Sequence, residues 1–84
     1  MIVRIRLGSS LARLALAGGN PILRLELPSD ATVGDLYDRL AGVAPELAPA
    51  LKSALPVLRG QHVGRDRALA PDDEVALLTP VAGG

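Results

Sequence analysis

The residues best suited to chemistry lie at the end of the sequence, where Val81-Ala82 leads into Gly83-Gly84. Glycine has no Cβ, so such a segment can pass through a narrow channel and adopt dihedral angles closed to other residues. The reacting group would be the α-carboxylate of Gly84, reached through Gly83 and extended from the domain by Val81 and Ala82. Because glycine is common at frayed chain ends, the pair alone is a weak signal. Its weight depends on the elements that precede it.

No side chain is a convincing catalyst in its place. The sequence has no cysteine, so it has no thiol nucleophile and no thiolate metal ligand. Its single histidine, His62, is interpreted as an ordinary strand or loop residue. The acidic run Asp72-Asp73-Glu74 is compatible with a divalent-metal cluster but fits a solvated turn better. We therefore expect no metal site and no bound cofactor.

Composition limits the classes of partner. A chain of 84 residues forms one domain with a modest core, and its only aromatic residue, Tyr37, leaves that core to aliphatic side chains. Nine basic residues balance nine acidic ones, and stacking aromatics are missing, so we expect no nucleic-acid partner. No run approaches the ~18 apolar residues of a membrane span, and Arg13 interrupts the one stretch that resembles a signal peptide. We expect a cytoplasmic protein without membrane contact.

The first half of the chain predicts two strands and a main helix. Apolar and polar residues alternate over 3–7 and over 22–27, and residues 11–17 between them have helical spacing. The main helix has Thr32 as N-cap and Asp35 in the place of the capping-box acid, and Gly42 is expected to end it in the left-handed conformation. The apolar stripe of this helix consists of Val33, Leu36, Tyr37 and Leu40.

The second half predicts two more strands. Two prolines limit residues 44–55 to a short helical turn or two. One extended piece is expected over 57–63. Residues 74–79 form a nearly continuous apolar run, typical of a strand covered on both faces, and Pro80 stops it.

The order strand, strand, helix, strand, strand indicates an α+β fold. The first and last strands are the most apolar, so we expect them side by side at the centre of the sheet. This arrangement predicts a ubiquitin-like β-grasp, a mixed four- to five-stranded sheet crossed by one main helix. The β-grasp domain is expected to cover residues 1–80, and 81–84 to form a flexible C-terminal Gly-Gly tail.

Residues 69–84 resemble the C-terminal signature of the MoaD/ThiS sulfur-carrier family, which consists of a leucine, a short turn, a strand that begins with two acidic residues and a valine or isoleucine, a Pro-Val step and a terminal Gly-Gly. The helix start Ala31-Thr32-Val33 is also similar to that family. Within the family, the helical segment at 11–17 and the Pro80-Val81 step most resemble the small subunit of molybdopterin synthase.

The resemblance implies a function for the tail. A ubiquitin-activating-like adenylyltransferase would use ATP to adenylate Gly84, and sulfur from a donor protein would convert the adenylate to a thiocarboxylate. The charged tail would then enter the large subunit of molybdopterin synthase and donate sulfur for the molybdenum cofactor. Such a carrier needs no general acid or base of its own, so whether to class it as an enzyme depends on the synthase complex.

Leu78 is the candidate partner-binding residue. It lies on the face of the last strand opposite Val75 and Leu77, where it is either buried under a loop or forms an apolar patch with Pro80. We favour the patch, docking the large subunit or the activating enzyme.

Other functions fit the same residues. The protein could carry sulfur for thiamine or for tRNA thiolation, or act as a ubiquitin-like modifier that forms isopeptide bonds on lysines. It could also be a non-catalytic β-grasp interaction module with an inert tail.

Overall fold

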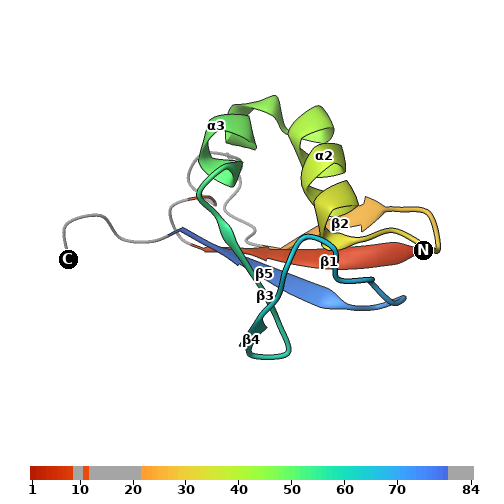
Figure 1. Ribbon diagram of the computed structural model, residues 1–84. Coiled ribbons are helices and arrows are strands. Elements are labelled where there is room, and N and C mark those ends of the chain that lie inside the picture. Colours follow the sequence, from red (N-terminus) through yellow and green to blue (C-terminus); the bar gives the residue numbers. More distant parts are fainter. Residues whose placement is uncertain (9–10, 12–21, 80–84) are drawn as a thin grey trace.

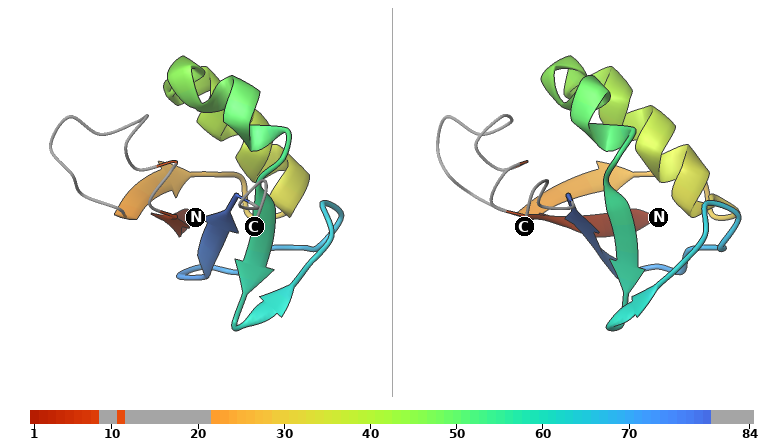
Figure 2. Two further views of the ribbon diagram at one scale, coloured as in Figure 1. Left: turned by 90° about the vertical axis from the view of Figure 1, so that its left-hand side faces the viewer. Right: turned by 60° about the vertical axis from the view of Figure 1, so that its left-hand side comes forward.

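The structure is a computed structural model, and it describes residues 1–8, 11 and 22–79. Within these residues, five strands form one mixed sheet in the order β2-β1-β5-β3-β4, and the helices lie over one of its faces (Figures 1 and 2). The strands are β1 (Ile2–Leu7), β2 (Ile22–Glu26), β3 (Leu55–Leu58), β4 (Gln61–His62) and β5 (Glu74–Leu78). The predicted sheet crossed by one main helix is confirmed. The helical segment predicted at 11–17 lies outside the described residues, apart from Leu11, which is fully buried.

The centre of the sheet is the pair β1 and β5. They run parallel, with Ile5 opposite Val75 and Leu7 opposite Leu77. Every other strand pairing described in the sheet is antiparallel. Ile5, Val75 and Leu77 are completely buried. The prediction that the first and last strands lie side by side is therefore confirmed.

Helix α2 (Val33–Val43) covers this apolar face, as Figure 1 shows. It begins with the predicted capping box, in which the Asp35 N–H donates to Thr32 Oγ1 (3.3 Å) and the Thr32 N–H donates to Asp35 Oδ2 (2.9 Å). These bonds satisfy amide groups that have no partner inside the helix. The predicted stripe faces the sheet and is buried, and it consists of Val33, Leu36, Tyr37 and Leu40.

The expected end of this helix at Gly42 is wrong. The helix continues through Gly42, and among the described glycines only Gly60 has a positive φ. The chain leaves the helix at Ala44 (φ −135°, ψ 73°), because the proline that follows disfavours helical geometry in the residue before it. The next turns are η1 (Pro45–Leu47) and α3 (Ala48–Leu51), which confirm the short helical turns predicted within 44–55. Leu55, which was expected to belong to that segment, instead begins β3.

The extended piece expected over 57–63 is also wrong. It is a tight hairpin between β3 and β4, with Leu58 paired to Gln61. Arg59 and Gly60 both have positive φ (54° and 80°), which is the signature of a type I′ turn. Such a turn matches the right-handed twist of the flanking strands, so two residues suffice to reverse the chain.

Strand β5 was predicted to be covered on both faces, and this is wrong. Val75 and Leu77 are buried under the helices, whereas Glu74 and Ala76 are half-buried and Leu78 is exposed. One side of the sheet is therefore open, and we call it the open face. No helix within the described residues is long and apolar enough to cross a membrane.

Candidate functional site at the end of β5

The predicted tail follows the last residue that the structure describes. Pro80, Val81, Ala82, Gly83 and Gly84 lie outside the described residues, so their roles stay predictions. The structure does place the root of that tail, because β5 ends at Leu78 and Thr79 is the last described residue.

The root of the tail is held firmly by the neighbouring strand. Leu77 is completely buried, and its carbonyl oxygen accepts a hydrogen bond from the Gly8 N–H at 2.9 Å. A Cβ at Gly8 would lie 3.2 Å from that oxygen and 3.5 Å from Leu78 Cδ2, so glycine permits this close approach. In the sequence, Gly8 directly follows the strand predicted over 3–7. Its role as a neighbour of the last strand depends on the parallel pairing.

Leu78 is exposed, which excludes the alternative that a loop buries it. Its side chain is 46% exposed, and its cross-strand partner Leu55 is 44% exposed. The two leucines form an apolar pair on the open face, directly before the tail. Leu55 was missed by the sequence analysis, because its assignment to a helical segment hid its pairing with β5.

The acidic turn before β5 is a structural element, and its interpretation as solvated is wrong for Asp73. Asp73 is buried, its Oδ2 accepts from the Ala70 N–H (2.8 Å), and its Oδ1 lies 3.3 Å from Arg59 Nη2. Asp72 has a positive φ of 67° in the turn. Glu74 pairs with Arg6, with Oε2 3.3 Å from Nε. Each acid therefore has its own surroundings, and the described residues contain no group of three or more potential metal ligands.

Two other polar residues lie away from the end of β5. His62 is an exposed residue of the short edge strand β4. Tyr37 is buried under the helix, and its hydroxyl donates to the Ala54 carbonyl at 2.8 Å. Burial raises the pKa of this phenol above its ordinary value, and Arg65, whose guanidinium lies 4.2 Å from the ring centroid, opposes that rise. Tyr37 thus fixes α2 to the chain before β3 and has no chemical role at the tail.

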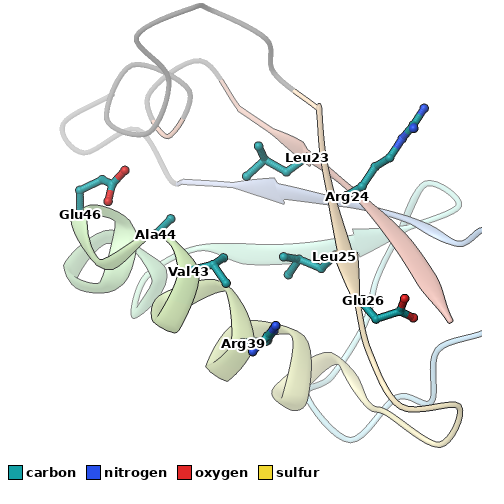
Figure 3. A pocket seen from close by; sticks show the side chains of 8 residues that line it. All are labelled: Leu23, Arg24, Leu25, Glu26, Arg39, Val43, Ala44 and Glu46. Carbon is teal, nitrogen blue, oxygen red and sulfur yellow. The ribbon is translucent and has the colours of Figure 1, made fainter.

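A groove of about 400 Å³ lies between β2 and the end of α2 (Figure 3). Its apolar lining comes from Leu23, Leu25, Val43 and Ala44, and Arg39 lies beside it. Leu25 belongs to the side of the sheet that α2 covers, whereas Leu55 and Leu78 lie on the open face. The groove is therefore separate from the site at the end of β5.

The sheet order, the central parallel pair and the single crossing helix define a ubiquitin-like β-grasp domain. Comparison with known proteins agrees with this fold and identifies the family. The model of the ThiS family matches residues 15–84, so the chain belongs to this family of ubiquitin-like sulfur carriers and modifiers.

Several relatives are similar over nearly their whole length. Small archaeal modifier protein 1 of Haloferax volcanii is 38% identical over 81 residues, which cover 87% of this chain and 93% of that protein. A crystal structure of the protein of that name from H. volcanii has a TM-score of 0.87 at 30% identity, with all of both chains covered. A putative molybdopterin converting factor subunit 1 from Pyrococcus furiosus has a TM-score of 0.80 at 22% identity, covering 96% of this chain and 99% of its own. This last likeness shows the fold alone.

Proposed function

We propose that this protein is a sulfur carrier whose Gly84 carboxylate is converted to a thiocarboxylate that supplies sulfur for molybdopterin. The observation that carries the proposal is that the ThiS family match extends to Gly84 and so includes the diglycine. The protein itself binds no cofactor in this scheme.

The proposed chemistry is activation followed by displacement. A carboxylate is a poor electrophile, so its oxygen first attacks the α-phosphate of ATP, giving an acyl-adenylate and pyrophosphate. The terminal sulfur of a donor protein's persulfide then attacks the acyl carbon, and AMP leaves. A thiol cleaves the resulting S–S bond, so that the sulfur stays on Gly84 and the thiol is oxidised to a disulfide. The reacting atom comes from this chain, and the enzyme that binds ATP supplies the catalytic groups.

The geometry at the end of β5 supports this division. The root of the tail is fixed through the Gly8–Leu77 hydrogen bond, and the apolar pair Leu55 and Leu78 lies beside it. Six residues from Thr79 to Gly84 span at most about 20 Å when extended. A partner that docks on the apolar pair must therefore hold its active site within that distance, which Val81, Ala82 and Gly83 would bridge.

Three partners follow from the proposal. They are a ubiquitin-activating-like adenylyltransferase that uses ATP, a sulfur donor protein and the large subunit of molybdopterin synthase. A solved complex of subunits 1 and 2 of the molybdopterin-converting factor from Helicobacter pylori has a subunit with this fold (TM-score 0.71, 20% identity). It supports the idea of a large-subunit partner, docked through Leu78 and Pro80. We place these ATP-dependent steps in the cytoplasm.

The test is the intact mass of the protein after incubation with the adenylyltransferase of its host, ATP and a persulfide donor. We expect the mass change of one oxygen replaced by sulfur, located at Gly84. Reactions without ATP, and a variant lacking Gly84, are the controls. An unchanged mass, with an enzyme that adenylates another carrier of the same host, would refute the proposal and favour an interaction module with an inert tail.

The acceptor of the sulfur needs its own experiment. The protein with a thiocarboxylate at Gly84 should supply the sulfur with which the synthase large subunit converts a pterin precursor to the dithiolene. Transfer to a thiamine precursor or to tRNA instead would move the protein to one of those pathways.

A second candidate function is protein modification. It is favoured by the 38% identity to small archaeal modifier protein 1, whose name describes a modifier. The same adenylate would then be attacked by the amine of a lysine to form an isopeptide bond with Gly84. Conjugates that appear in host extract with ATP, and that disappear with the Gly84 deletion, would establish this activity.

A further inference from the structure

Two arginines face each other on the open face of the sheet. Arg4 of β1 is directly opposite Arg24 of β2. Met1 and Leu27 exchange both backbone hydrogen bonds (2.7 and 2.8 Å), so the alternation of an antiparallel pair makes Arg4 and Arg24 a non-hydrogen-bonded pair. The Arg4 N–H agrees, because it donates to the Asp73 carbonyl on the other side of β1. Pairs of this kind bring their side chains closest together, and like charges opposite one another are destabilising.

Within the described residues, neither arginine forms an ion pair with a carboxylate. Glu74 pairs with Arg6, Glu26 with the Met1 amino group and Asp73 with Arg59. Asp72 lines the same hollow as the two arginines, but its carboxylate is not paired with either of them. Arg4 Nη2 reaches only the backbone carbonyl of Asp72, at 3.4 Å. Figure 3 shows the Arg24 side chain pointing away from α2, on the opposite side of β2 from Leu23 and Leu25. Both arginines are thus exposed, and the part of the chain that the structure describes gives them no anionic partner.

The arginine pair and the apolar pair share one face. Strand register places Arg4 opposite Glu74, and Leu78 lies four residues further along β5 on the same side. At 3.3 Å per residue, the two ends of this surface are about 13 Å apart along the strand. This span fits within one partner's share of a standard interface, about 800 Å². The open face therefore carries an apolar pair near the tail and an arginine pair away from it, with the Arg6–Glu74 ion pair nearby.

We propose that the open face docks an acidic surface of the adenylyltransferase, with carboxylates of that enzyme bound by Arg4 and Arg24 while Leu55 and Leu78 direct the tail into its active site. This inference rests on the proposed function and adds the chemistry of the surface that its partner must present. Guanidinium groups bind carboxylates through paired hydrogen bonds, and a carboxylate between the two arginines removes their mutual repulsion. Charge complementarity of this kind steers association and selects the partner.

A protein partner fits these observations better than a nucleic acid. The sequence is neutral overall, with nine basic and nine acidic residues, and its only aromatic residue is buried under α2. A surface that binds single-stranded nucleic acid would need a larger excess of basic residues and aromatic side chains on which bases stack. The apolar pair Leu55 and Leu78 on the open face would make no favourable contact with a phosphate backbone.

The test compares Arg24→Glu with Lys52→Glu, which makes the same change of charge at an exposed residue after α3, on the helix side of the sheet. Adenylation by the host enzyme is measured by ATP–pyrophosphate exchange at low and at high salt. For Arg24→Glu we expect the KM for the carrier to rise about tenfold at low salt, and its salt dependence to flatten. We also expect its Tm to rise by roughly 2–4 °C, because an unlike pair replaces a like pair. Lys52→Glu should leave the KM at the wild-type value.

Several results would overturn the inference. An unchanged KM for Arg24→Glu, with wild-type protein charged normally in the mass assay, leaves the carrier function standing and removes the docking surface. A lower Tm together with a higher KM means that Arg24 stabilises the fold. Retention of the wild type on a single-stranded polynucleotide, lost in Arg24→Glu, means a nucleic-acid surface. Failure of the wild type to be charged at all refutes the proposed function, and this inference with it.

Discussion

Leu78→Asp separates docking from folding at the end of β5. Leu77 and Leu78 are adjacent, but the first is 0% exposed and the second 46% exposed. Full burial of a leucine stabilises a protein by about 1.5–3 kcal/mol, so a half-exposed one contributes about 1 kcal/mol. The new carboxylate lies at the surface and needs no burial. We expect a loss near 1 kcal/mol in the free energy of unfolding, or about 4–8 °C in Tm for a domain of this size. The core control Leu77→Ala should lose about 2–5 kcal/mol.

The effect on partner binding should be larger than the effect on stability. If the apolar pair docks the adenylyltransferase or the synthase large subunit, the introduced carboxylate must be desolvated beside apolar groups in the complex. We expect a loss of about 2 kcal/mol or more in binding free energy, equivalent to a Kd at least about thirtyfold higher. Calorimetric titration with each partner gives the Kd, and thermal unfolding of the free protein gives the Tm.

Two results for Leu78→Asp would contradict these expectations. A Leu78→Asp variant that melts as early as Leu77→Ala would mean that Leu78 belongs to the core. A variant with nearly unchanged Tm and unchanged Kd for both partners would remove Leu78 from the interface. A second variant, Leu55→Asp, tests the same surface from β3 and should behave alike, because the two leucines are cross-strand neighbours.

Three further changes test the remaining reasoning. Gly84→Ala should abolish charging with sulfur, measured by intact mass, while leaving the Tm unchanged, because the core residues lie in the folded domain; a lower Tm would contradict this separation. Asp73→Ala should cost about 1–2 kcal/mol in urea unfolding, mostly through the Ala70 N–H, since Arg59 is exposed and adds little; an unchanged midpoint would show that the turn does not need its carboxylate. The folded state raises the pKa of Tyr37 above its ordinary value of 10.0, so it holds the phenolic proton more tightly than the unfolded chain does. The stability from this group should be complete below pH 10 and fall as pH rises through the folded pKa, and Tyr37→Phe should lack that part of the fall.

Local patterns were reliable where a single element decides its own geometry. The capping box of α2 and its buried stripe depend on residues three or four apart, so sequence spacing is sufficient. The same holds for strand β1, whose alternation needs only one dry face. Errors occurred where local signals competed. Gly42 has the chemistry of a helix terminator, but helix packing continued past it until the residue before Pro45.

The candidate site divides in the same way. The diglycine and its Pro-Val lead are sequence features, and the family match extends over them. The surface beside the tail was only half predicted, since Leu78 was named and Leu55 was not. Asp73 was expected in water and is buried. Its carboxylate accepts from the nearby Ala70 N–H and lies beside Arg59 of the β3–β4 hairpin, a neighbour that only the folded chain supplies.

The sequence by itself determined the first two strands, the main helix, the last strand, the neutral charge balance and the candidate reacting group at Gly84, because these follow from residue type and short-range spacing. The tertiary structure decided which residues from different strands share a surface. Pairing of β5 with β1 and β3 brings Gly8 against Leu77 and Leu55 against Leu78. Pairing of β1 with β2 brings Arg4 against Arg24. Those neighbours are separated by tens of residues in the chain, and their contacts depend on strand register. A shift of one residue would exchange the side chains that face the helices with those that face solvent. Register is therefore fixed only when one side of the sheet packs against the helices.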